Sequence, residues 1–184
     1  MRIDRLSLTD FTVFAQAELE FSPGLNVLIG ANGTGKSHVL KVLYSLLKAT
    51  SSVRPDGDDT SRYRAQLGHA ILMKLSGTFR PDSERGVHGS LIRRGAIGSE
   101  IQIKSEFGTM AVQLKEEAAV TNIPRRTPPA MGPVVFIPTN EVLSIYDGFI
   151  AAYDRRELSF DETYYDLCVA LSGKPLKAIT TPGF

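Results

Sequence analysis

The residues best suited to chemistry form one glycine-rich stretch near the N-terminus. It reads Gly30-Ala31-Asn32-Gly33-Thr34-Gly35-Lys36-Ser37 and matches the pattern Gly, four residues, Gly-Lys-Ser/Thr at every position. Glycines let the backbone turn its amides inward. Those amides, together with the positive end of a following helix, make a nest for phosphate oxygens. This stretch, called the phosphate loop below, predicts binding of a nucleoside triphosphate.

The last two residues of the loop are expected to complete the site. Lys36 reaches the β- and γ-phosphates as a point charge. The Ser37 hydroxyl ligates Mg²⁺, which bridges the same phosphates. We therefore predict ATP and Mg²⁺ as cofactors. The predicted nucleotide-binding residues are Gly30, Ala31, Asn32, Gly33, Thr34, Gly35, Lys36 and Ser37.

The loop needs a strand before it and a helix after it. Residues 25–29 form a short apolar run and predict a buried strand. A helix is expected from residue 35 to about residue 48, with an apolar stripe along it. The stripe consists of Leu40, Leu43 and Leu47, widened by Val39, Val42 and Leu46.

Most other predicted elements are strands. Alternating apolar residues predict strands over residues 2–9, 11–21 and 70–79, and a hairpin over residues 100–114. The polar, charged stretch 50–68 predicts a mobile loop or an insertion. The connectors are residues 80–98, rich in Gly and Arg, and residues 121–133, rich in Pro.

The C-terminal part predicts one strand and two helices. Residues 134–137 are the most apolar short run and should form a core strand. A first helix should cover roughly residues 141–153. Ser159 and Glu162 form a capping box for a second helix that ends near Leu171.

Composition limits the possible classes of protein. The chain has 184 residues, 42% of them hydrophobic and 22% charged, which suits one globular domain or one domain with a small subdomain. The net charge of +1 argues against a generally basic, nucleic-acid-coating surface. Cys168 is the single cysteine, so a reducing compartment fits best. No apolar run approaches the roughly 20 residues needed to span a bilayer. We therefore expect a cytoplasmic protein without a membrane partner.

Three segments carry a resemblance to a known family. Residues 3–11, residues 25–37 and the stretch Phe136-Ile137-Pro138-Thr139-Asn140-Glu141-Val142-Leu143-Ser144 resemble the N-terminal lobe of RecF- and SMC-like ATPases. These are P-loop, AAA-family proteins related to the ABC transporter ATPases. The resemblance implies an α/β fold, an ABC-ATPase-like lobe with a mixed core sheet plus an antiparallel β subdomain. It also implies that residues 1–184 form a single lobe, with the antiparallel part over 70–115 and a core strand and helices over 134–173.

The same resemblance suggests further site residues. In the family's Q-loop, a polar residue after the core strand helps to hold Mg²⁺ and the attacking water, and Asn140 and Glu141 stand at that place. The alternative is that they only begin a helix after Thr139. Relatives often carry a basic residue near the nucleotide where this chain has Asp10-Phe11-Thr12, and Arg5 is a weak substitute.

The chain departs from the family at two motifs. A Walker B strand that ends in Asp-Glu and a Leu-Ser-Gly-Gly signature are both missing. Asp161-Glu162 is better explained as helix capping, and Leu171-Ser172-Gly173-Lys174 as a helix stop. The resemblance therefore implies that a second ATPase lobe or a homodimer partner completes the site. Hydrolysis of ATP is then expected of the intact protein, in DNA repair or phage defence.

Other functions remain open at this stage. A regulatory or assembly module that binds ATP without hydrolysing it is the main alternative. A small P-loop kinase fits the hairpin less well, and a GTPase lacks its Asn-Lys-x-Asp motif. Arg93-Arg94 and Arg125-Arg126 could contact DNA phosphates, although paired arginines on loops are more often only solvated.

Overall fold

The computed structural model describes residues 2–54, 60–80, 90–115, 118–122, 134–138, 149–155 and 159–173. The chain divides into two compact units, Met1–Val134 and Val135–Phe184. The single-lobe organisation over residues 1–184 stays a prediction, and each unit is described by itself.

The first unit is built on a five-stranded antiparallel sheet with the strand order β2-β1-β3-β4-β5. Its strands are β1 (Ile3–Phe11), β2 (Phe14–Glu20), β3 (Ser99–Ser105), β4 (Gly108–Leu114) and β5 (Ala118–Asn122). The two predicted N-terminal strands and the predicted hairpin are confirmed. Strand β5 was not expected, because its last two residues were assigned to the proline-rich connector.

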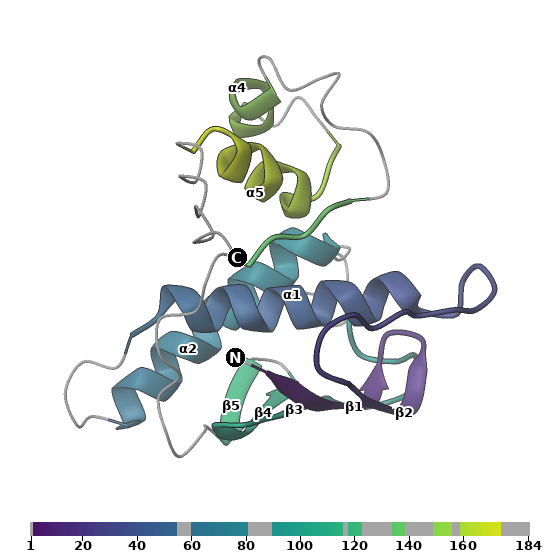
Figure 1. Ribbon diagram of the computed structural model, residues 1–184. Helices are drawn as coiled ribbons and strands as arrows, with labels where there is room; N and C mark the ends of the chain where they lie inside the picture. The colour runs from purple at the N-terminus through teal and green to yellow at the C-terminus, as the bar shows by residue number, and fades with distance from the viewer. Residues whose placement is uncertain are drawn as a thin grey trace, which may run out of the picture. The chain divides into compact units, whose positions relative to one another are not determined.

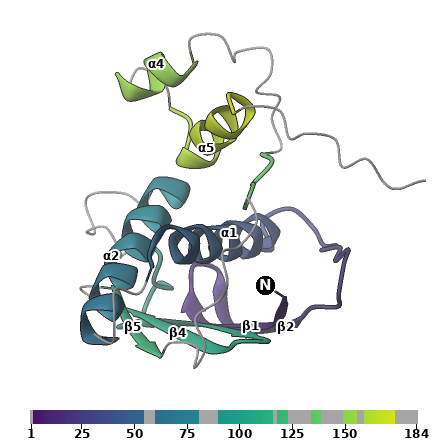
Figure 2. The ribbon, with the colours of Figure 1, turned by 60° about the vertical axis from the view of Figure 1, so that its left-hand side comes forward.

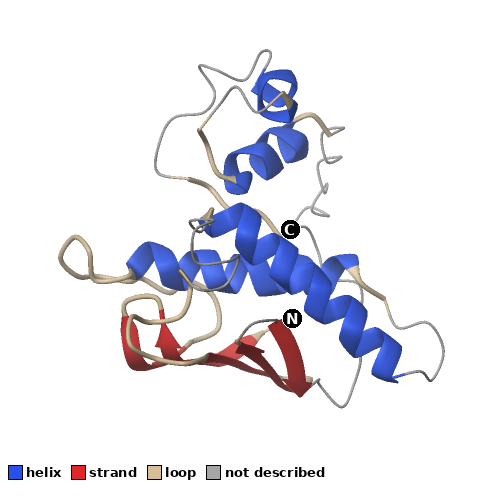
Figure 3. Cartoon of the chain, turned by 180° about the vertical axis from the view of Figure 1, so that it is seen from behind, coloured by secondary structure: helices blue, strands red, loops and turns tan. Residues whose placement is uncertain are grey.

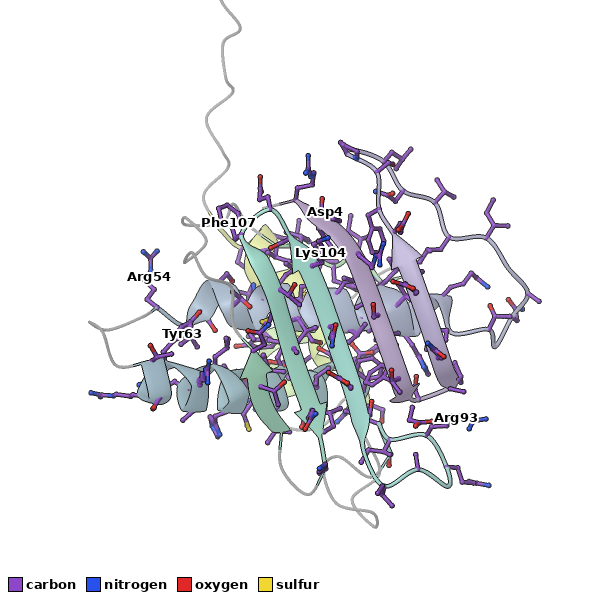
Figure 4. The ribbon with its side chains drawn as sticks, turned by 90° about the horizontal axis from the view of Figure 1, so that it is seen from below. Asp4, Arg54, Tyr63, Arg93, Lys104 and Phe107 are labelled. Carbon is purple, nitrogen blue, oxygen red and sulfur yellow. The ribbon has the colours of Figure 1, made fainter. Side chains whose placement is uncertain are left out.

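The sheet has one apolar and one polar face, because side chains alternate along each strand. Leu6 and Leu8 of β1 are fully buried, and Leu8 pairs with Ile101 of β3 on the same face. The opposite face carries polar and charged residues such as Arg5 and Lys104, and Figure 4 looks onto it. The apolar face is therefore the one that needs a cover.

Two helices cover the apolar face, α1 (Lys36–Ser52) and α2 (Thr60–Phe79). Figures 1 and 2 show both on the same side of the sheet. The predicted helix after the loop is confirmed, but its stripe is corrected. Val39, Val42 and Leu46 are the buried residues, whereas Leu40 is 49% exposed. The sheet lies under the Val39 side of the helix, and sequence periodicity alone did not locate that side.

Helix α2 corrects two expectations. Residues 60–68 were expected to be a loop and residues 70–79 a strand, but both are helical. Ile71, Met73 and Leu75 alternate as strand residues do, yet Met73 is 58% exposed. Leu67, Ile71 and Leu75 are fully buried, and their spacing of four places them on one helix face. The packing of this face against the sheet decides the conformation.

Both predicted core strands, residues 25–29 and 134–137, are wrong as buried strands. Neither segment pairs with a strand among the described residues, and Figure 3 draws residues 25–29 as loop. Leu25 is 87% exposed and Ile29 is 92% exposed. In the second unit, Val135 is 48% exposed and Ile137 is 79% exposed. These apolar runs have the composition of core strands but no cover in the described parts of the chain.

The described part of the second unit consists mainly of α4 (Phe149–Asp154) and α5 (Glu162–Leu171). Phe149, Tyr164 and Cys168 form its small core. The predicted second helix is confirmed, but its cap is not Ser159. Asp161 is the N-cap, and its carboxylate accepts a hydrogen bond of 2.9 Å from the Thr163 amide.

Helix α1 offers a matched test of the first core. Leu46→Ala should lower the free energy of unfolding by about 2–5 kcal/mol, because it leaves a cavity in a close-packed interior. Leu40→Ala on the same helix should cost less than about 1 kcal/mol, because Leu40 is already half exposed. Urea unfolding followed by circular dichroism measures both. Equal losses would contradict the assignment of the buried face.

Candidate functional site

The phosphate loop turns through two glycines with left-handed backbone. Gly33 has φ 80° and Gly35 has φ 94°, conformations that residues with a Cβ rarely adopt. Gly35 is the N-cap of α1, and no side chain caps this helix start. The first turn also carries no acidic residue. The helix N-terminus is therefore electrostatically suited to an anion.

Lys36 lies folded over its own loop. Its Nζ donates hydrogen bonds of 2.6 Å to the carbonyl oxygens of Gly30 and Ala31. The Thr34 hydroxyl donates to the Ala31 carbonyl as well, at 2.9 Å. Two neutral carbonyls compensate an ammonium charge only in part, so phosphate oxygens would be stronger partners for it.

The other predicted site residues differ in how far the structure describes them. Ser37 is exposed in the first turn of α1, so its hydroxyl is open to solvent and to a hydrated Mg²⁺. Asn140 and Glu141 lie outside the described residues, and their catalytic role stays a prediction. Arg125 and Arg126 also lie outside them.

The turn between β1 and β2 forms a wall of the loop. A Cβ added at Gly35 would lie 2.7 Å from Cγ2 of Val13 and would collide with the Phe14 ring. This close approach, together with the positive φ, excludes any other residue at position 35 without movement. Sequence reasoning assigned Gly35 to phosphate binding, and the structure adds this packing constraint.

His38 lies in the first turn of α1, and the structure shows its contacts. Its Nδ1 lies 2.9 Å from Oγ1 of Thr12, in the β1–β2 turn. Its ring meets that of Phe79 edge-on, with the centroids 5.5 Å apart. Burial, and after it the positive charge of Lys41, lowers the pKa of His38. No spacing in the sequence connects residues 12, 38 and 79, so only the fold reveals this cluster.

The lowered pKa of His38 predicts a pH dependence of stability. An unfolded chain takes up this proton near pH 6.5, but the folded chain takes it up only at lower pH. The unfolded state therefore binds more protons just below pH 6.5, and stability should fall as the pH drops through this region. His38→Asn should reduce the fall measured by urea unfolding between pH 7 and pH 5. A fall in His38→Asn equal to that of the unaltered chain would contradict this role of His38.

The candidate basic contacts separate into two groups. Arg5 is wrong as a substitute for the family's nucleotide contact. It bonds Glu18 and Glu20 at 2.5 Å each, on the sheet face opposite the one that α1 covers. Arg93 and Arg94 are exposed on the loop before β3, and Figure 4 shows Arg93 pointing away from the sheet.

Membrane insertion finds no support in the described helices. Among the described ranges, none combines the length and the apolar composition that a bilayer crossing requires.

A family of known proteins matches most of the chain. The AAA ATPase domain family matches residues 1–142. A DNA replication and repair protein RecF from Renibacterium salmoninarum is 45% identical over 97 residues, which are 53% of this chain and 24% of that protein. RecF from Arthrobacter sp. is 31% identical over 115 residues, 57% of this chain and 26% of that protein. RecF from Magnetococcus marinus is 43% identical over 63 residues, 34% of this chain and 16% of that protein.

The chain thus spans about a quarter or less of the length of these curated relatives. The family match covers most of the chain, including all of the phosphate loop. With its α/β fold and its RecF relatives, this chain belongs to the AAA ATPase domain family as a RecF-like N-terminal ATPase lobe.

Proposed function

We propose that this lobe binds ATP with Mg²⁺ through the phosphate loop, residues 30–37. The uncapped start of α1 carries the proposal, because it follows two left-handed glycines and has Lys36 folded over the loop. Lys36 would exchange the carbonyls of Gly30 and Ala31 for phosphate oxygens. The exposed Ser37 hydroxyl would hold Mg²⁺, and the ion when bound neutralises phosphate charge.

A second lobe completes the site in this proposal. Residues 25–29 expose three large apolar side chains: Leu25, Val27 and Ile29 are 87%, 68% and 92% exposed, whereas Leu28 packs on the core. Three adjacent outward apolar side chains are typical of a surface that another element covers. Since this segment leads directly into the phosphate loop, its cover would adjoin the nucleotide. The completing lobe lies on the same polypeptide, on another one or on a second copy.

The intact protein would hydrolyse ATP in the cytoplasm and act in DNA repair or phage defence. Relatives named as DNA replication and repair proteins support a role in DNA repair. The exposed Arg93 and Arg94 would suit contacts with DNA phosphates. The alternative is a module that binds ATP without turnover. It is favoured for this lobe alone, because no Walker B carboxylate occurs in the sequence to position the attacking water.

Calorimetric titration with Mg-ATP and Mg-GTP, run beside a phosphate-release assay, tests the proposal. We expect ATP binding without steady turnover in this chain alone. Steady turnover would instead assign a catalytic carboxylate within the chain, and Glu141 and Glu162 would be substituted next. Absence of heat with either nucleotide would refute nucleotide binding by this lobe.

The cover for residues 25–29 needs a test of its own. With a second copy as the cover, the double change Leu25→Thr with Val27→Thr should reduce self-association of the isolated chain in sedimentation velocity. With any cover outside this chain, the double change should leave the melting temperature unchanged, because both side chains are already exposed. Ile97→Thr is the matched control, since Ile97 is 96% exposed in a different loop. A lowered melting temperature would show that the segment is packed within this chain and needs no second lobe.

A further inference from the structure

Backbone strain gathers at one junction beside the phosphate loop. Among the described residues other than glycine, three have positive φ: Asp10 at 48°, Thr12 at 52° and Arg80 at 46°. Asp10 and Thr12 lie at the β1–β2 turn, taken here with the adjoining strand ends as residues 10–14, and Arg80 directly follows α2. Each such residue costs about 1–2 kcal/mol. It persists only where its surroundings impose the conformation.

The backbone on one side of the turn is held by the segment before β3. The Thr12 amide donates to the Leu91 carbonyl at 2.8 Å, and the Arg93 amide donates to the Asp10 carbonyl at 2.8 Å. Phe11 and Ile92 form a bridge between these two bonds. This side of the turn is therefore fixed by the sheet and its flanking loop.

The other side is held by a side chain of α1. Nδ1 of His38 lies 2.9 Å from Oγ1 of Thr12, two residues after Lys36. His38 is itself braced by Phe79 at the end of α2. Lys41, one turn further along α1, donates to the Thr78 carbonyl at 2.9 Å and lies over the Phe79 ring. The Thr12–His38 pair thus joins the turn to a rigid corner between α1 and α2.

In this position, the β1–β2 turn forms the wall against which the phosphate loop packs. Val13 and Phe14 leave no room for a Cβ at Gly35. Gly35 is the N-cap of α1, whose free amides face any bound phosphate. A shift of the turn would therefore move Gly35 and change the direction of those amides.

We propose that His38 is a positioning residue, which through Thr12 fixes the β1–β2 turn against Gly35 and holds the phosphate loop in its binding conformation. The proposal rests on nucleotide binding by this loop as its function, but its first readout does not need nucleotide. The hydrogen bond sets the loop geometry before any ligand arrives, so the free protein already reports on it.

The test uses four single variants of the full chain and one double variant. Thr12→Val and His38→Phe remove one partner each and keep the shape. Thr12→Ser keeps a hydroxyl at position 12, and His38→Asn keeps a polar side-chain atom close to the position of the His38 Nδ1. Hydrogen exchange of the peptides that cover residues 30–37, without nucleotide, is measured first. We expect faster exchange in Thr12→Val and His38→Phe, and recovery in Thr12→Ser and His38→Asn.

Mg-ATP affinity is the second readout. Thr12→Val and His38→Phe should each weaken binding about fivefold, the loss expected for one hydrogen bond. The double variant should bind no more weakly than either single one, because both remove the same bond. Thr50→Val is the control, since its hydroxyl bonds the Leu46 carbonyl far along α1.

The two proposals fail in different ways. Unchanged exchange of residues 30–37 in Thr12→Val and His38→Phe would overturn the role of His38, whatever the affinity for ATP. Faster exchange with no ATP binding by the unaltered chain would support the positioning role and refute the nucleotide site. Additive losses in the double variant would also overturn the coupling between residues 12 and 38.

Discussion

Lys36→Ala should abolish measurable binding of Mg-ATP, with affinity lowered at least about a hundredfold. Its Nζ is proposed to contact both the β- and the γ-phosphate, and each bond to a charged group contributes about 1.5–3 kcal/mol. Two such contacts exceed the roughly 2.7 kcal/mol that a hundredfold change requires. Displacement of a fluorescent ATP analogue, with calorimetry at high protein concentration, measures the loss.

A matched control separates this contact from a general charge effect. Lys104→Ala removes the same charge from the polar face of the sheet, where Figure 4 shows the side chain. We expect its ATP affinity to stay within about twofold of the unaltered chain, because exposed charges beyond a Debye length of roughly 8–10 Å are largely screened. Similar losses in both variants would mean that the nucleotide is attracted by net charge alone.

Gly35→Ala should damage stability and binding together. An alanine at position 35 must keep the positive φ of 94°, and its Cβ collides with the side chains of Val13 and Phe14. The backbone strain costs about 1–2 kcal/mol, and overpacking adds about 1–3 kcal/mol. We therefore expect the free energy of unfolding to fall by about 2–5 kcal/mol, and ATP binding to weaken because the N-cap of α1 moves.

Gly24→Ala provides the comparison for the collision. Gly24 has φ 89°, close to that of Gly35, but nothing lies within 4 Å of its added Cβ. Only the backbone strain of about 1–2 kcal/mol should remain. Chemical unfolding of the two variants therefore isolates the packing of the β1–β2 turn on the loop. If both lose the same stability, the turn does not form a wall at Gly35.

The strands and the loop illustrate what can be predicted locally. The β3–β4 hairpin was predicted because Ile101 and Ile103 alternate with polar residues, while Met110, Val112 and Leu114 share one face of the next strand. The phosphate loop was predicted because its glycines and Lys36 occupy a fixed pattern over eight consecutive residues. Both patterns depend only on residue types and on spacings within a few residues, so they can be recognised without knowing which distant parts of the chain come into contact.

Helix α2 shows where local patterns fail. Its apolar residues fit a period of two as well as a spacing of four, and only packing against the sheet selects the helix. Local patterns also fail at residues 25–29, whose apolar composition predicts a buried strand. Burial depends on a neighbour that the described parts of the chain do not provide.

The sequence by itself therefore determined the helix after the glycine-rich stretch, the N-terminal strands and the family resemblance, and it predicts phosphate binding by residues 30–37. The tertiary structure decided which face of α1 is buried, that residues 60–79 are helical, and that Thr12 and Phe79 meet His38. The physical reason is the range of the interactions. Backbone conformation and phosphate chemistry depend on neighbouring residue types, whereas burial and side-chain pairing depend on residues brought together only by folding.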